Sequence, residues 1–148
     1  MEKNILNIKF NSHAELLFEI IDKKISITQE QIKSKTRTRT LADIRRVIIN
    51  ILKKSNPKAT VYEIAAVVNR DHSSVSTQTK EHFKLYGNNK EYSGLFDFIN
   101  NNFQNILNSN KPLVELYKDR NYLESRLEIV NQAIVEMESN KENFRFLQ

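Results

Sequence analysis

Glycine and proline are scarce in this 148-residue chain, which has only two of each. Strand turns and phosphate-binding loops depend on these residues, so few places remain for either. Between the breaks, apolar residues recur at the three- and four-residue spacing of amphipathic helices. A hydrophobic content of 39% supports one core of ordinary size and no second large domain. We therefore predict an all-α fold made of one domain and a helical extension.

Capping residues place the predicted helices along the chain. A first helix is expected after Ser12, which is a good cap, and residues 41–52 form an amphipathic helix that Pro57 stops. Residues 60–63 have the capping-box pattern, so a short helix should cover residues 61–68. Another helix begins after Asp71, and a further one covers residues 93–107. The inward face of the helix after Asp71 is expected to carry Val75, Thr79, Phe83 and Tyr86.

These elements predict three segments. Residues 1–11 form an N-terminal arm, residues 12–88 a helix-turn-helix domain, and residues 93–148 a helical hairpin or coiled-coil arm. Charge is divided between them. Residues 33–58 contain nine basic residues and one acidic residue, whereas residues 112–148 contain five basic and seven acidic residues. The basic stretch favours a polyanionic partner.

Several classes of protein are disfavoured. The chain has no cysteine and no apolar run of about 18 residues, so we expect a cytoplasmic protein without a disulfide framework or a membrane span. Its three histidines, His13, His72 and His82, do not fall into a metal-binding pattern. We expect no enzyme activity, no cofactor, no metal and no small-molecule substrate.

The helix after Asp71 has the features of a DNA-reading helix. In such a motif the N-terminal end of the second helix reaches base edges in the major groove. Asp71 is suited to accept from a cytosine amino group, His72 to donate to guanine or thymine, and Ser73 to contact either kind of edge. Ser74 and Thr77 are placed for phosphates. The alternative interpretation is that Asp71 only caps the helix and His72 is an ordinary surface residue.

Residues 40–80 resemble the C-terminal DNA-binding domain of the bacterial replication initiator DnaA. That family carries a Gly-Arg-Asp-His-Thr/Ser-Thr-Val run, and this chain has Asn-Arg-Asp-His-Ser-Ser-Val at residues 69–75. Residues 25–35 are similar to the segment that precedes the family's basic run, and Arg37, Arg39 and Arg45 stand at matching places. The resemblance covers residues 12–86. It departs from the family's pattern at Asn69, which replaces a glycine in a link one residue shorter, and at Ile44, where a proline is common.

The resemblance implies base contacts by the Asp-His-Ser run and a minor-groove role for Arg45, with Arg46 as the rival candidate. The full set of predicted DNA-binding residues is Arg37, Arg39, Arg45, Arg46, Lys54, Thr60, Arg70, Asp71, His72, Ser73, Ser74, Thr77 and Lys80. The chain lacks the Gly-x-x-x-x-Gly-Lys-Ser/Thr loop of an ATPase module. We therefore expect a stand-alone, sequence-specific reader of double-stranded DNA in replication or transcription control, similar to a phage or accessory replication or regulatory protein.

The final helix carries a narrow apolar stripe. From Leu113 to Met137, apolar residues repeat with alternating steps of three and four, interrupted once by Arg120. Such a stripe needs a partner helix, either residues 93–107 of the same chain or a second copy, and we expect a homodimer through residues 113–137. Two alternative functions remain: an adaptor that binds protein through this helix, and an RNA-binding protein that uses the basic run.

Overall fold

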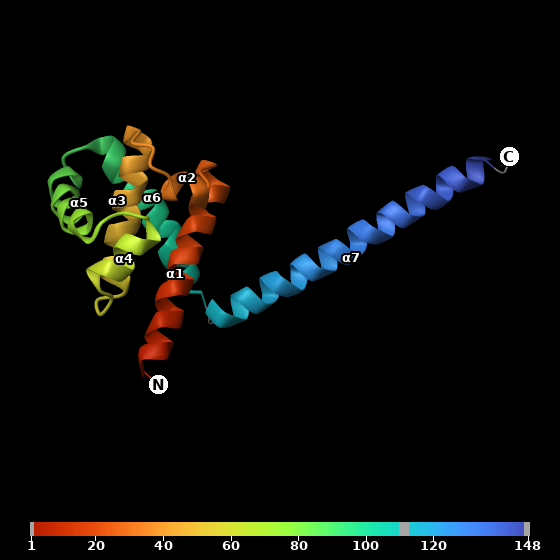
Figure 1. The fold of residues 1–148 in the computed structure, drawn as a ribbon, viewed down its shortest axis with the longest axis horizontal. Coiled ribbons are helices and arrows are strands. Elements are labelled where there is room, and N and C mark those ends of the chain that lie inside the picture. Colours follow the sequence, from red (N-terminus) through yellow and green to blue (C-terminus); the bar gives the residue numbers. More distant parts are fainter. Residues whose placement is uncertain (1, 110–112, 147–148) are drawn as a thin grey trace. The chain divides into compact units, whose positions relative to one another are not determined.

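The computed structural model describes residues 2–109 and 113–146, with the side chains of residues 7–109 and 115–142. Seven α-helices and no strand occur in this described part: α1 (Glu2–Ile25), α2 (Gln29–Lys33), α3 (Arg39–Ser55), α4 (Val61–Val67), α5 (His72–Leu85), α6 (Lys90–Leu107) and α7 (Leu113–Phe146). The chain divides into two compact units, Met1–Asn108 and Ser109–Gln148. The prediction of an all-α protein with a helix-turn-helix and a helical C-terminal segment is confirmed (Figure 1).

Helix α1 begins well before the predicted start. Residues 2–11 belong to the helix and are not a separate strand or arm, and Ser12 lies inside it. The reason is visible in the spacing, because Phe10 is buried on the same face as Ala14, Leu17 and Ile21. The apolar stripe therefore starts before Ser12 and continues through the helix.

Helix α3 is the centre of the first unit. It contacts α1, α2, α4, α5 and α6 (Figure 1). Its predicted apolar residues are all buried, and they are Leu41, Ile44, Val47, Ile48, Ile51 and Leu52. Thr38 caps the N-terminus by accepting from the amide of Leu41, so the helix starts two residues earlier than the apolar pattern suggested. Asn56, just before Pro57, ends it.

Helices α4 and α5 form the helix-turn-helix, and both pack on α3. Thr60 caps α4 by accepting from the amide of Glu63, and Ile64, Ala65 and Val68 anchor it in the core. In the first turns of α5, the side chain of Val75 is buried. The predicted inward position of Phe83 is wrong, because this side chain is 75% exposed.

His82 takes the inward place that was predicted for Phe83. Its Nδ1 lies 2.6 Å from the hydroxyl of Tyr92, a buried residue of α6, and its ring contacts Phe96. Burial, and secondarily the charge of Arg46, lowers the pKa of His82 below its ordinary value. A neutral imidazole thus joins α5 to α6.

Helix α6 belongs to the first unit, which corrects the predicted segment of residues 93–148. It contacts α1 and α3, and buries Tyr92, Phe96, Ile99 and Phe103. The apolar face that was considered as a partner for the last helix is therefore occupied by the core of the first unit. In the described residues of the second unit, the structure has one long helix, α7.

The predicted stripe of α7 is exposed in the single chain from Leu123 to Met137. Leu123, Leu127, Val130, Ile134 and Met137 are between 48% and 67% exposed, whereas the side chain of Leu113 is not among those that the structure describes.

None of the helices in the described part of the chain combines the length and the apolar character that crossing a bilayer requires.

Candidate nucleic-acid interface

The N-terminal tip of α5 is presented to solvent. Asp71, His72 and Ser73 are all exposed. Asp71 occupies the N-cap position, but its side chain makes no capping hydrogen bond, and Ser74 donates instead to the Asp71 backbone carbonyl. The interpretation of Asp71 as a side-chain cap is therefore wrong. Its carboxylate is available to accept from a ligand, as the base-reading prediction requires.

The turn before this tip depends on Asn69. Its φ of 54° lies in the left-handed region, where glycine is favoured and asparagine is among the best tolerated alternatives. The Nδ2 of Asn69 also donates to the carbonyl of Lys33 at 3.0 Å. Asparagine thus supplies the backbone conformation for which the resemblance predicted a glycine, and it ties the turn to the last residue of α2.

Arg45 does not occupy the surface position that a minor-groove residue needs. It is 5% exposed, and its guanidinium donates to four backbone carbonyls. The Nε–O distance to Ile32 is 2.7 Å, and the Nη distances are 2.8 Å to Thr36, 2.9 Å to Ser34 and 3.3 Å to Gln31. Burial, and then the charge of Arg70, lowers the pKa of Arg45. The predicted minor-groove role does not fit this geometry, in which Arg45 holds residues 31–36 against α3.

Arg46, the rival candidate, is also turned inward. Its Nε donates to Oε1 of Gln78 at 2.8 Å, its Nη1 lies 2.7 Å from Oδ1 of Asp43, and its guanidinium lies over the ring of Tyr92. Its side chain is only 11% exposed. Arg46 therefore joins α3 to α5 and α6, and its predicted place among the DNA contacts does not fit this geometry.

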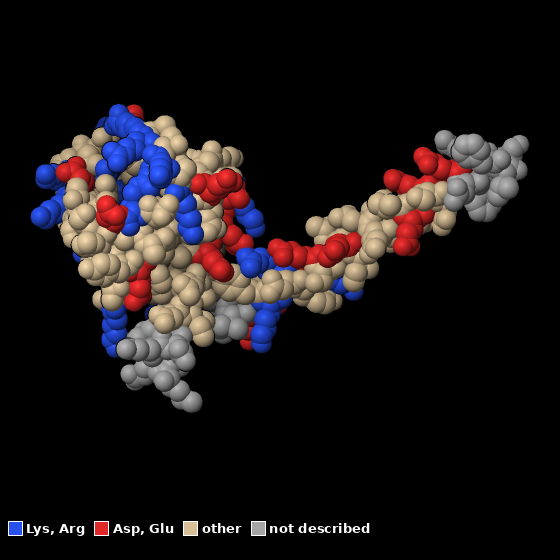
Figure 2. Space-filling model, in the orientation of Figure 1, with Lys and Arg blue, Asp and Glu red and all other residues tan. Residues whose placement is uncertain are grey.

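Basic side chains line a cavity beside the tip of α5. The cavity has a volume of about 330 Å³ and is lined by Arg37, Ala42, Arg45, Ile49, Arg70, Ser74 and Gln78. Arg70 donates to the carbonyls of Asn69 and Ser34, and Arg37 is exposed. Figure 2 shows Lys and Arg side chains gathered on the part of the first unit where α3 begins. The guanidinium groups of Arg37 and Arg70 beside a helix N-terminus suit this cavity to a phosphate group, whereas that of Arg45 is already bonded to backbone carbonyls.

The other predicted residues lie around this centre or apart from it. Arg39 is exposed, with its Nη2 3.8 Å from Oε2 of Glu91, and Lys80 is exposed on α5. Thr77 is exposed, and its hydroxyl donates to the Ser73 carbonyl. Lys54 lies near the C-terminus of α3, about 22 Å along the helix axis from Arg39 at 1.5 Å per residue.

The structure adds two residues that the sequence interpretation missed. Gln78 lines the basic cavity and accepts from Arg46, and its spacing of four residues from Ser74 on α5 was an available signal. Tyr62 of α4 contacts His72 with its ring. Thr60, two residues earlier, uses its hydroxyl as an acceptor for the Glu63 amide, so its role in capping is observed.

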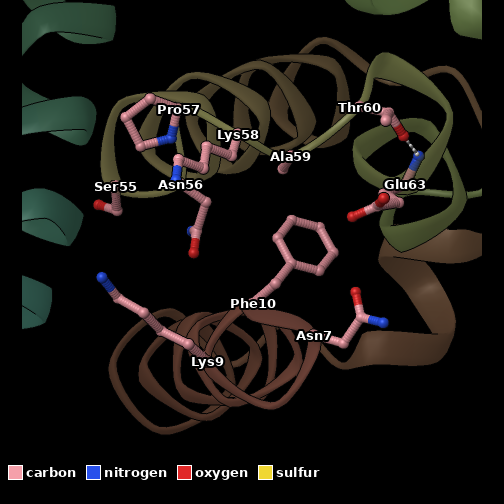
Figure 3. Close-up of a pocket in the computed structure, with 10 residues that line it drawn as sticks. All are labelled: Asn7, Lys9, Phe10, Ser55, Asn56, Pro57, Lys58, Ala59, Thr60 and Glu63. Carbon is pink, nitrogen blue, oxygen red and sulfur yellow. Dashed lines mark hydrogen bonds between the residues drawn. The ribbon is translucent and has the colours of Figure 1, made fainter. Parts of the chain in front are cut away.

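A larger cavity lies on another face of the first unit. It has a volume of about 660 Å³ and lies between α1 and the connection from α3 to α4. Figure 3 shows the ring of Phe10 directed toward this connection; Lys9 and Lys58 also line the cavity. Its lining contains no nucleophile paired with a base. Within the described residues, no group of three or more His, Cys, Asp or Glu side chains is arranged to hold a metal ion.

The comparisons with known proteins agree with the helix-turn-helix geometry. Residues 14–81 match the family model described as the bacterial dnaA protein helix-turn-helix. No curated protein and no solved structure matches the chain. The matched segment extends from the middle of α1 into α5, and it includes the Asn69 turn, the exposed tip and the basic cavity.

Proposed function

Because residues 14–81 match the family model of the bacterial dnaA protein helix-turn-helix, we propose that the protein binds a specific sequence in double-stranded DNA. The tip of α5 enters the major groove, where Asp71, His72 and Ser73 contact base edges. The observation that carries this proposal is the exposure of all three side chains at a helix N-terminus whose Asp71 carboxylate is not used as a cap.

Phosphates of the duplex are held by the basic cavity beside this tip. Arg37, Arg70 and Ser74 supply donors there, and Lys80 and Thr77 extend the footprint along α5. These contacts orient the protein on the duplex and make binding sensitive to salt.

A minor-groove contact, if the family's docking mode is kept, comes from the segment before α3 and from the first residue of that helix. Arg37 and Arg39 are exposed there, whereas Arg45 and Arg46 are turned inward. We propose Arg37 and Arg39 as the cations that approach the adjacent minor groove, in place of the two arginines predicted from the sequence. Arginine is favoured in a narrow minor groove because of its negative potential.

The domain relates the protein to replication initiators, and we propose an accessory role in replication or transcription control within a bacterial or phage-infected cytosol. A DnaA C-terminal domain is not itself catalytic, and we propose no ATPase activity. Helix α7 is proposed to pair with the same helix of a second copy, because the apolar face of α6 is buried in the first unit and the stripe of α7 is exposed. A dimer would bind paired sites.

Selection from a random duplex pool, followed by binding measurements on two variants, tests the proposed function. His72→Ala should weaken binding to the selected duplex by about 5- to 150-fold, equivalent to roughly 1 to 3 kcal/mol, and change binding to a shuffled duplex little. Lys80→Ala, on the exposed face of α5, should weaken binding to both duplexes to the same degree. Equal losses on both duplexes for His72→Ala, or a pool without an enriched sequence, would contradict base reading.

A further inference from the structure

Tyr62 is an exposed aromatic residue on the first turn of α4. Its side chain is 65% exposed, and its ring centroid lies 4.8 Å from that of His72 with an angle of 33° between the planes. Aromatic rings at this separation attract each other beyond the effect of their buried area. The contact joins the two helices of the motif beside the exposed N-terminal tip of α5.

His72 is otherwise loosely held. It is the first residue of α5, it is exposed, and no hydrogen bond to its imidazole is found among the described residues. An imidazole that reads a base must direct one ring nitrogen at an acceptor on the base edge. A side chain that rotates freely loses that rotational freedom when it binds, at a cost in affinity.

Tyr62 belongs to a helix that is packed firmly into the core. Helix α4 is fixed by the buried residues Ile64, Ala65 and Val68, and Thr60 caps the turn that carries Tyr62. The exposed position of Tyr62 on this turn leaves its ring free to lie against His72 instead of entering the core. The orientation of the imidazole is therefore set from α4 and not only from its own helix.

We propose that Tyr62 is a positioning residue that orients the His72 imidazole for base reading before DNA binds. The inference rests on the proposed function, since it assigns Tyr62 a part in sequence recognition. Tyr62 acts through His72, so its contribution should disappear when the imidazole is absent.

A double-mutant cycle on the full-length protein tests this role. The probes are the duplex enriched by the wild-type protein and a shuffled duplex of equal length. Tyr62→Ala should weaken binding to the enriched duplex about 2- to 10-fold and leave the shuffled duplex unaffected, whereas Tyr62→Phe, which keeps the ring, should retain wild-type affinity. In a His72→Ala background, Tyr62→Ala should cause no further loss.

A spectroscopic measurement on the free protein supports the cycle. The imidazole carbon-bound protons of His72 should shift in the NMR spectrum when Tyr62→Ala removes the neighbouring ring current, and should stay in place in Tyr62→Phe. An unchanged shift in Tyr62→Ala would overturn the ring contact itself. Both substituted side chains are exposed, so the fold should be retained.

The outcomes separate this inference from the proposed function. If the wild-type protein enriches a sequence but Tyr62→Ala binds it normally, the positioning role fails while base reading stands. An equal loss for Tyr62→Ala with and without His72 would also overturn it, because Tyr62 would then contact the duplex by itself. Absence of sequence-selective binding by the wild-type protein would overturn the proposed function and this role together.

Discussion

Replacing Arg45 distinguishes a structural arginine from a DNA contact. In the structure the guanidinium of Arg45 donates to the carbonyls of Gln31, Ile32, Ser34 and Thr36. Arg45→Met keeps much of the aliphatic stem and removes all four hydrogen bonds. We expect a loss of stability, whereas a minor-groove role would cause a loss of DNA affinity in a protein of normal stability.

The expected loss of stability depends on which of the four carbonyls keep another hydrogen-bond donor when Arg45 is replaced. The carbonyl of Ser34 also accepts from Arg70, and that of Gln31 also accepts from the hydroxyl of Ser34. Only the carbonyls of Ile32 and Thr36 lose their side-chain donor without such a replacement, and the bond to Ile32 is buried. An unsatisfied buried acceptor costs roughly 1 to 3 kcal/mol, so we expect a decrease of about 3 kcal/mol in the free energy of unfolding. That corresponds to a decrease of about 12 °C in Tm for a domain of this size.

Urea and thermal unfolding measure this change, and Arg39→Met is the matched control. Arg39 is 73% exposed and has one weak ion pair with Glu91, so its replacement should alter stability by less than about 0.5 kcal/mol. The DNA affinity of both variants is measured at 15 °C, where each remains folded. A stability of Arg45→Met within 0.5 kcal/mol of the wild type would refute the argument, and a selective loss of affinity would restore the minor-groove assignment.

Two further predictions concern pH and self-association. The pKa of His82 is lowered by burial and by Arg46, so the unfolded chain takes up its proton first as pH falls. The stability that the neutral ring contributes is present above about pH 6.5 and decreases below it. The urea midpoints at pH 7.5 and pH 5.5 should therefore differ less in His82→Gln than in the wild type. An equal difference in the two proteins would contradict this. In sedimentation velocity, replacing both Leu123 and Leu127 with Glu should convert a wild-type dimer to a monomer, while Ser125→Glu should leave the dimer intact. A monomeric wild-type protein would remove the proposal that α7 pairs with a second copy.

Local patterns were sufficient for the helix-turn-helix and its exposed tip. Apolar spacing located α3, and the Thr60 cap with the run after Asn69 located α4 and α5. These features depend on residues within a few positions of each other. Phe10 belonged to the same pattern, and its spacing to Ala14 was enough to show that α1 starts before Ser12.

Contacts between distant segments were beyond the reach of such patterns. Arg45 is turned inward because carbonyls of residues 31–36 lie beside α3, and nothing in the sequence around Arg45 indicates this. Likewise, the spacing of Phe96, Ile99 and Phe103 shows that α6 has an apolar face but not that α1 and α3 cover it. The resemblance singled out Arg37, Arg39 and Arg45; the structure exposes Arg37 and Arg39 and buries Arg45.

Two separate parts of the chain donate hydrogen bonds to adjacent carbonyls where α2 ends and the connection to α3 begins. The carbonyl of Ser34 accepts from both Arg45 and Arg70, and the neighbouring carbonyl of Lys33 accepts from Asn69. Arg45 belongs to the core helix, whereas Asn69 and Arg70 belong to the turn ahead of α5. These hydrogen bonds therefore join residues 33 and 34 to the turn at Asn69 and Arg70, and the proposed binding of a duplex would need little additional ordering of this backbone. A phosphate bound at the turn or at residues 33 and 34 would therefore contact two parts of the chain that are already bonded to each other.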